Sequence, residues 1–448
     1  MNVSASTWRF PRAFWTANLV ELCERAAYYG SFIVLTVYLS RVVGMRDSVA
    51  NIVGALFGAL IYLFPFFTGA VADRMGFRRA LILAFGLLTC GYGLLGAFDT
   101  APPVLSGLFL IVLGGSFVKP IITGTVAKSS DAANRARAYS LFYMTVNIGA
   151  FLGKTVVKGV RQDLGVANVP WFSSGAALVG LLFVILLYHP DRDAVRVQAP
   201  PVAETLRGMW RAMKRLRFLA LILITAGFWA IQGQLYAAMP KYVLRLVGEG
   251  AAPEWYANIN PFVVVLFVVP VTHLIRRWRP EAAIAVAMMM IPFSALAMSL
   301  SPLLGGDVTI FGVVMHPITA MMIIGISIQG LAECFLSPKY LEYASRQAPA
   351  GEEGLYLGFA HMNTFFAWLF GFVLSGFLLE RYCPDPRLLD ELSRKQWEAA
   401  IAGQGAMPAA YAQAHYLWYA WAIVGGLSFL ALLIYVAVTR RIDTRTGS

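Results

Sequence analysis

Long apolar segments separated by short polar ones run through the whole chain. A helix needs about 20 mostly apolar residues to cross the hydrocarbon core of a bilayer. Helices that are apolar on all sides are typical of membrane spans. Windows of that length predict twelve spans, near residues 13–39, 49–72, 79–98, 103–126, 138–160, 170–188, 217–240, 257–275, 281–300, 313–338, 354–380 and 413–438.

A polar, basic stretch divides these twelve spans into two groups of six. We therefore predict an all-α integral membrane protein with a six-helix lobe at 1–188, a cytoplasmic basic linker at 189–216 and a second six-helix lobe at 217–448. This layout is typical of two-lobed transporters, whose substrate site lies near the membrane midplane. Hydropathy alone leaves a channel or a membrane-embedded enzyme open.

The charge distribution agrees with this topology. Only 13% of the residues are charged, whereas soluble proteins have about 25%. Most of the 36 Lys and Arg fall in segments that face inward when both termini are cytoplasmic, as the positive-inside rule requires. The net charge of +12 thus follows from topology and predicts no nucleic-acid partner.

Motifs for catalysis and metal binding are missing from the sequence. It contains no H-E-x-x-H, no G-x-S-x-G and no phosphate-binding glycine loop, so we predict that the protein is not an enzyme. No pair of histidines has metal-ligand spacing, and three of the four cysteines lie in apolar spans. We therefore expect neither a metal site nor a disulfide framework.

Six charged residues fall within the predicted spans away from their ends, where each costs about 3 kcal/mol at the helix centre on some scales. They are three acids and three bases: Glu21, Glu24, Arg25, Lys119, Lys154 and Glu333. This balance suggests mutual pairing in a hydrated interior. The first three share one helical stripe, so Glu21 can pair with Arg25 and leave Glu24 free to face Lys119 or the cavity. A static salt-bridge cluster that locks helices together is the alternative.

Several motifs resemble those of a known transporter family. The loop after the second span, GAVADRMGFRRA at 69–80, resembles a signature of the major facilitator superfamily. Four stretches, in order, resemble motifs of its proton-dependent oligopeptide transporter family: ELCERAAYYG at 21–30, GGSFVKPIITG at 114–124, YSLFYMTVNIGAF at 139–151 and AECFLSPKYLEYASRQAP at 332–349. The resemblance implies the major facilitator fold and proton-driven uptake of di- and tripeptides by alternating access.

The resemblance also implies roles for particular residues. It implies a proton-coupling group made of Glu21, Glu24, Arg25 and Lys119. Glu333 would receive the amino terminus of the peptide. The implied substrate-binding residues are Tyr28, Tyr29, Tyr62, Lys119, Asn147, Gln234, Asn260 and Glu333. The implied setting is a monomer in the inner membrane of a bacterial cell, with lipid, protons and a small-molecule substrate as partners and with the proton gradient in place of a cofactor.

Two positions depart from the family pattern and one residue is added. Phe32 stands where the family has an arginine for the substrate carboxylate, and Gly233 stands where it has a glutamate in the seventh span. Lys154 follows Asn147 by about two helical turns, so both point the same way. Lys154 either replaces the missing arginine in the substrate site or extends to the lipid headgroups with Lys158.

These departures leave the cargo open. The leading hypothesis is a proton symporter for short peptides or peptide-like compounds. The second is a relative whose cargo has changed to another small zwitterion, an anion or a modified peptide, with altered proton coupling. A membrane-embedded enzyme or a sensor that kept the fold is the remote alternative.

Overall fold

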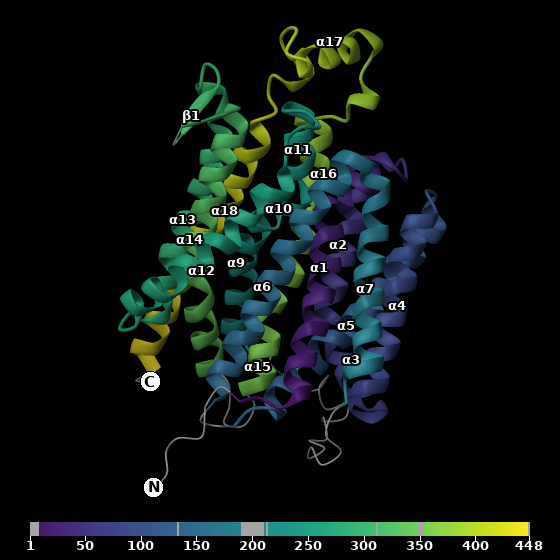
Figure 1. The fold of residues 1–448 in the computed structure, drawn as a ribbon. Helices are drawn as coiled ribbons and strands as arrows, with labels where there is room; N and C mark the ends of the chain where they lie inside the picture. Colours follow the sequence, from purple (N-terminus) through teal and green to yellow (C-terminus); the bar gives the residue numbers. More distant parts are fainter. Residues whose placement is uncertain are drawn as a thin grey trace. The chain divides into compact units, whose positions relative to one another are not determined.

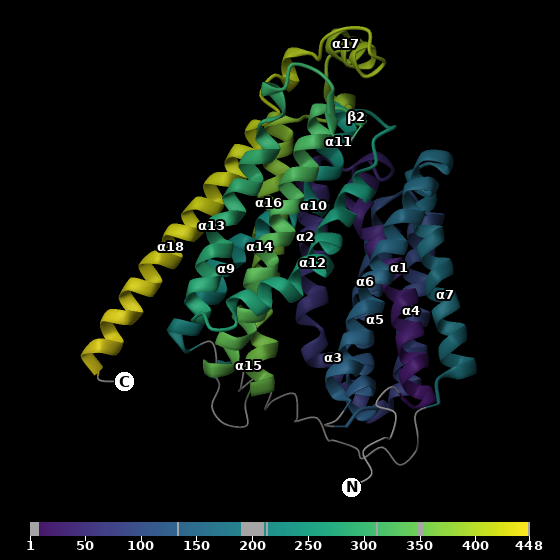
Figure 2. The ribbon, with the colours of Figure 1, turned by 60° about the vertical axis from the view of Figure 1, so that its left-hand side comes forward.

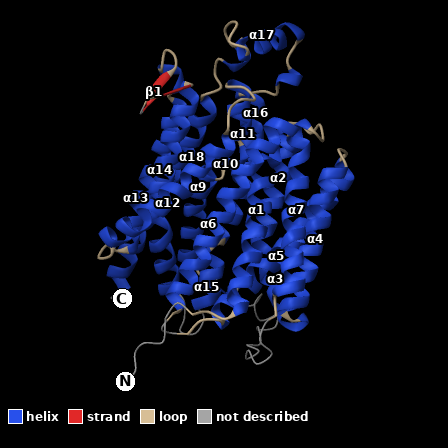
Figure 3. Ribbon diagram, in the orientation of Figure 1, coloured by secondary structure: helices blue, strands red, loops and turns tan. Residues whose placement is uncertain are grey.

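In the computed structural model the protein is helical almost throughout, and a short β-hairpin is the exception (Figure 3). The structure describes residues 9–131, 134–189, 210–211, 214–310, 312–347 and 353–446. Most of the predicted linker at 189–216 lies outside these residues. The chain packs into two units, one made of Met1–Gly44 and Leu60–Thr205 and the other of Met45–Ala59 and Leu206–Ser448. The predicted division at 188 and 217 follows the chain order and stays a prediction.

Unit 1 consists of long helices that contact one another at small residues. Its helices are α1 (Arg12–Arg41), the end of α2 (Asp47–Leu63), α3 (Pro65–Met75), α4 (Phe77–Ala97), α5 (Ala101–Lys128), α6 (Arg135–Gly159) and α7 (Val169–Leu187), with short π and 3₁₀ turns at Val160–Leu164 and Val166–Asn168. α1 packs against α5, α6 and α7, and α4 packs against α5 and α7 (Figure 1).

Glycines permit these close approaches. A Cβ at Gly153 of α6 would lie 2.3 Å from the carbonyl oxygen of Ala26 in α1. A Cβ at Gly91 of α4 would lie 2.7 Å from the carbonyl oxygen of Gly107 in α5, and the reverse contact has the same length. Any larger residue would push these backbones apart, because small residues are what allow membrane helices to pack closely.

Unit 2 contains the remaining helices and the hairpin. It has α9 (Leu216–Gln232), α10 (Gln234–Ala237), α11 (Met239–Leu246), α12 (Pro253–Ile275), α13 (Pro280–Ser299), β1 (Val308–Ile310), β2 (Val313–Met315), α14 (Pro317–Gln347), α15 (Glu353–Ala360), α16 (Met362–Tyr382), α17 (Glu391–Ile401) and α18 (Tyr416–Thr446), with 3₁₀ turns at Ser301–Leu303, Pro386–Leu388 and Ala409–Tyr411. α13 packs against α14 and α18, and α9 packs against α16 and α18 (Figure 2).

The spans agree with the sequence prediction apart from local breaks. Eleven stretches of the described residues are helical, long and apolar enough to cross a membrane. α1 has the length for a twelfth but carries Glu21, Glu24 and Arg25. The predicted span at 313–338 is wrong at its start, because 313–315 form strand β2 and the helix begins at Pro317. The span predicted at 217–240 breaks at Gly233, between α9 and α10.

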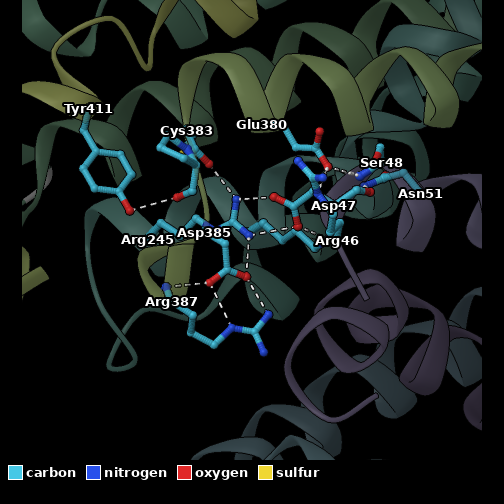
Figure 4. Close-up of polar contacts among 12 residues, drawn as sticks. Arg46, Asp47, Ser48, Asn51, Arg245, Glu380, Cys383, Asp385, Arg387 and Tyr411 are labelled. Carbon is cyan, nitrogen blue, oxygen red and sulfur yellow. Dashed lines mark hydrogen bonds and ion pairs between the residues drawn. The ribbon is translucent and has the colours of Figure 1, made fainter. Parts of the chain in front are cut away.

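A buried group of charges ties the start of α2 to α11 within unit 2 (Figure 4). We call Asp47, Lys241, Arg245 and Asp385 the Asp47 clasp. Asp47 Oδ1 accepts a hydrogen bond of 2.7 Å from Lys241 Nζ, and Asp47 Oδ2 accepts one of 2.7 Å from Arg245. The side chains of Asp47, Lys241 and Arg245 are at most 4% exposed.

The segment after α16 completes the clasp. Arg245 donates a hydrogen bond of 2.6 Å to the carbonyl oxygen of Cys383, and its Nη2 lies 3.4 Å from Asp385 Oδ2. Trp397 of α17 donates a hydrogen bond of 2.7 Å to the carbonyl oxygen of Arg245. Burial lowers the pKa of Lys241 to about 8, although Asp47 opposes this shift. For Asp385, burial is outweighed by the hydrogen bond from Arg387 and the charge of Arg245, so its pKa lies below the usual range.

Asp47→Asn is expected to destabilise the protein strongly. The variant removes the carboxylate that Lys241 and Arg245 share and leaves Asp385 as the acid beside Arg245, and breaking a buried ion pair costs about 3–5 kcal/mol. The measurement is the thermal unfolding temperature of the purified protein in detergent. The control is Arg394→Ala, which removes an exposed ion pair with Glu398 and should change little. Equal melting temperatures for the two variants would contradict the structural role of the clasp.

Candidate functional site

The charged residues of α1 form one connected group in unit 1. Arg25 Nε lies 3.4 Å from Glu21 Oε1, which confirms the predicted pair. Arg25 also forms a close ion pair and hydrogen bond with Glu24, so the prediction that Glu24 is left free to face Lys119 or the cavity is wrong. Glu21 and Glu24 are 2% and 1% exposed. The guanidinium group lies over the rings of Tyr28 and Tyr29, at 5.1 and 5.7 Å.

Helix α5 brings Lys119 near this group. A Cβ at Gly115, one turn before Lys119, would lie 3.8 Å from Glu24 Oε1, so the glycine lets the carboxylate approach α5. Lys119 is close enough to Glu21, Glu24 and Arg25 to interact with their charges, and its Nζ lies 5.7 Å from the centre of the Tyr62 ring. Among the described residues no carboxylate forms a direct ion pair with Lys119. The amine is thus near Glu24 without being bound to it.

Helix α6 contributes Lys154 and Asn147. Lys154 is 1% exposed, and its Nζ lies 5.8 Å from the centre of the Tyr29 ring. This burial contradicts the alternative in which Lys154 extends to the headgroups. Tyr29 therefore has Arg25 and Lys154 as cationic neighbours. Asn147 is partly exposed and donates 2.8 Å to the carbonyl oxygen of Tyr143 in its own helix.

The aromatic ring that replaces the family arginine packs against a predicted site residue. The rings of Phe32 and Tyr28 are stacked, with centroids 5.3 Å apart. Phe32 is 2% exposed. The position thus supplies an apolar wall for Tyr28, and Lys154 of α6 lies over the ring of the adjacent Tyr29.

In unit 2, Glu333 on α14 is held by two neutral amides. Gln232 at the end of α9 donates a hydrogen bond of 2.6 Å to Glu333 Oε2, and Asn260 of α12 donates one of 3.4 Å to the same oxygen. Sequence reasoning identified Glu333 and Asn260 but missed Gln232. The signal for it was available, because Gln232 immediately precedes Gly233, where the family carries its acid.

Gln234 was predicted as a substrate-binding residue, but its amide group is hydrogen-bonded to other groups of the protein. The side chain is 1% exposed. Its Nε2 donates 2.7 Å to the carbonyl oxygen of Ala230, and its Oε1 accepts a hydrogen bond from Ser375. The polar group of this helix that reaches the predicted carboxylate is Gln232. Within the described part of the chain, no group of three His, Cys, Asp or Glu could hold a metal ion.

Comparison with known proteins identifies the family and several relatives. The profile of the Major Facilitator Superfamily matches residues 18–315. The dipeptide and tripeptide permease A of Proteus mirabilis is 29% identical over 187 residues, which are 41% of this chain and 37% of that protein. A di-/tripeptide transporter of Lactococcus lactis subsp. cremoris is 31% identical over 196 residues, 41% of this chain and 38% of that protein. The chain thus matches less than half the length of these relatives.

Solved structures share the fold. A peptide transporter POT crystallised with sulfate has a TM-score of 0.71 at 19% identity and covers 96% of this chain, with 95% of its own chain covered. A POT family transporter in complex with 5-aminolevulinic acid has a TM-score of 0.71 at 17% identity, with coverage of 96% and 97%. These findings confirm the sequence resemblance to the proton-dependent oligopeptide transporters, and the chain belongs to the major facilitator superfamily.

Proposed function

We propose that the protein is a proton-coupled symporter that takes up di- and tripeptides or peptide-like compounds by alternating access. The observation that carries the proposal is the different environment of two sets of ionisable groups within the helices. Arg25 pairs with Glu21 and Glu24, and Lys154 lies buried beside Tyr29, whereas Glu333 has amides as its partners. A zwitterion needs a cation for its carboxylate and an anion for its ammonium group, and Lys154 and Glu333 are groups of these two kinds.

Proton coupling is assigned to Glu24. A buried carboxylate that loses its cationic partner takes up a proton, and it releases the proton when the cation returns. Glu24 has two possible cations, Arg25 in direct contact and Lys119 nearby. A change of partner during alternating access would therefore link the protonation of Glu24 to the direction in which the transporter opens.

Lys154 is assigned as the anchor for the substrate carboxylate. It stands beside Tyr29, is buried, and belongs to the unit in which the family arginine is replaced by Phe32. A charged hydrogen bond between ammonium and carboxylate is stronger than a neutral one. The same assignment places Tyr28, Tyr29, Tyr62 and Asn147 as walls and hydrogen-bonding partners of the substrate.

The cellular setting is part of the proposal. We place the protein in the inner membrane of a bacterial cell, as a monomer with both termini cytoplasmic and with no cofactor. Its family membership favours a transporter over a membrane-embedded enzyme or a sensor. Its relatives named as di-/tripeptide transporters support short peptides as cargo.

A changed cargo is the second candidate. Phe32 and Gly233 remove one cation and one acid from the family pattern, and Lys154 adds a cation at a new place. Such a relocation suits another small zwitterion, an anion or a modified peptide. One family transporter of the same fold was solved with 5-aminolevulinic acid, which is a zwitterion smaller than a dipeptide.

Dialanine is expected to stabilise the purified protein in a thermal-shift screen, since a ligand that binds only the folded state raises its melting temperature. Free amino acids and 5-aminolevulinic acid complete the screen. Glu333→Gln should abolish the effect of dialanine, because the neutral amide cannot pair with the ammonium group. Stabilisation by the smaller zwitterions, with none by any peptide, would favour the changed cargo.

Glu24→Gln is expected to abolish accumulation driven by a pH gradient in proteoliposomes while retaining exchange of substrate between the two sides. The amide keeps the size of the side chain and cannot carry a proton. Glu398→Gln is the control, because Glu398 is exposed on α17 and should behave as the original protein. Accumulation by Glu24→Gln at the rate of this control would rule out the assigned role.

Lys154→Met is expected to weaken dialanine binding by about 10- to 100-fold, the size of a lost charged hydrogen bond. Binding of alanine amide derivatives without a free carboxylate should change little, because they have no carboxylate to pair with the ammonium group of Lys154. The measurement is competition with a labelled dipeptide. Lys158→Met is the matched control one turn along α6. An equal loss for the carboxylate and the amide ligands would contradict the anchor.

A further inference from the structure

The surroundings of Glu333 contain more hydrogen-bond acceptors than the protein itself satisfies. Glu333 Oε2 accepts from Gln232 and Asn260. Among the described residues, none donates to Glu333 Oε1. An ionised carboxylate can only accept hydrogen bonds. Glu333 Oε1 is therefore open to a donor from outside the protein.

Gln232 adds a second open acceptor. Because its NH₂ group points to the carboxylate, its own carbonyl oxygen points elsewhere. That oxygen, Oε1, is buried and has no hydrogen-bond partner among the described residues. A buried polar atom left in this way costs free energy, so its presence beside Glu333 calls for a donor at the same place.

Gln329 adds a third open hydrogen-bond acceptor. It is 0% exposed, and neither its Nε2 nor its Oε1 has a partner among the described residues. Gln329 precedes Glu333 by four residues on α14, and side chains four apart in a helix are neighbours, about 6 Å apart at Cβ. The open amide and the carboxylate thus share one stripe of α14.

The neighbours of two glycines show which way this stripe faces. A Cβ at Gly325 would meet Met298 and Ser294 of α13, and a Cβ at Gly330 would meet Val263 and Asn260 of α12. Successive residues of a helix are about 100° apart around its axis. The side chain of Gln329 therefore points roughly 40° away from the direction of Gly325, and that of Glu333 points roughly 80° away from the same direction. Both therefore lie between the α13 side and the α12 side, where Gln232 of α9 meets Glu333.

We propose that Gln232 and Gln329 are specificity-determining residues that, with Glu333, form a three-acceptor seat for a primary ammonium group. A primary ammonium has three N–H donors, one each for Glu333 Oε1, Gln232 Oε1 and Gln329 Oε1. Gln232 also acts as a positioning residue, since its NH₂ group fixes the carboxylate. The inference rests on the proposed function and adds the requirement that the amine carry three N–H groups.

The seat predicts discrimination against substituted amines. A secondary ammonium with one N-methyl group has two N–H donors, so one buried acceptor stays unpaired. A site built to hydrogen-bond a group rejects the analogue that lacks it. We expect the protein to bind dialanine about tenfold more tightly than its N-methyl derivative, the size of one unsatisfied acceptor.

The test compares these two ligands on the full-length protein in detergent, by competition with a labelled dipeptide. Gln329→Met and Gln232→Met keep the length of the side chain and remove its acceptor, so each is expected to bring the preference for dialanine to within about threefold. Two variants are used so that the failure of one to fold leaves the other informative. The control is Met322→Leu, a buried apolar exchange on the same helix.

The outcomes separate this inference from the proposed function. A preference that is lost in the glutamine variants and kept in Met322→Leu supports the seat. A preference that persists in both glutamine variants means that it arises from steric exclusion of the methyl group, and the seat is overturned. Equal binding of both ligands by the original protein also overturns it. Absence of binding by any peptide contradicts the proposed function itself.

Discussion

The neutralisation of charge inside membrane-spanning helices is the constraint on which the rest of this structure depends. A charged side chain taken out of water costs several kcal/mol, and the protein meets this cost by grouping. Glu21 and Glu24 share Arg25, and Lys119 stands close by. Gly115 and Gly153 contribute by bringing the backbones of α5 and α6 near α1.

The charged group of α1 and Glu333 meet this constraint by different chemistry. The group of α1 balances its carboxylates with Arg25, so a change of proton occupancy alters which partners attract one another. Unit 2 holds Glu333 with amides, which satisfy an oxygen without neutralising its charge. A carboxylate kept in this way favours an incoming cation, and the open amides of Gln232 and Gln329 add direction to that preference. In the proposed function, proton coupling and substrate recognition therefore rest on different interactions.

The Asp47 clasp shows a third use of buried charge. Its residues are paired with one another and enclosed by the segment that carries α17. Such a group holds its helices in register, because each charge depends on the others for neutralisation. Nothing in the local sequence sets Asp47 apart from an ordinary first-turn acid near a helix N-terminus. Lys241 and Arg245 are recognisable only once α11 has folded beside α2.

The sequence by itself determined eleven of the spans to within a few residues or local breaks, the charged stripe of α1 and the motifs of a transporter family, because hydropathy, helical periodicity and motif spacing are local properties of the chain. It also placed Glu333 and Asn260. Tertiary structure alone decided which groups on different helices meet. It buried Lys154 beside Tyr29, joined Gln234 to Ser375 and brought Gln232 to Glu333. The reason is that the partner of each of these side chains lies on another helix, and their separation along the chain carries no record of the contact.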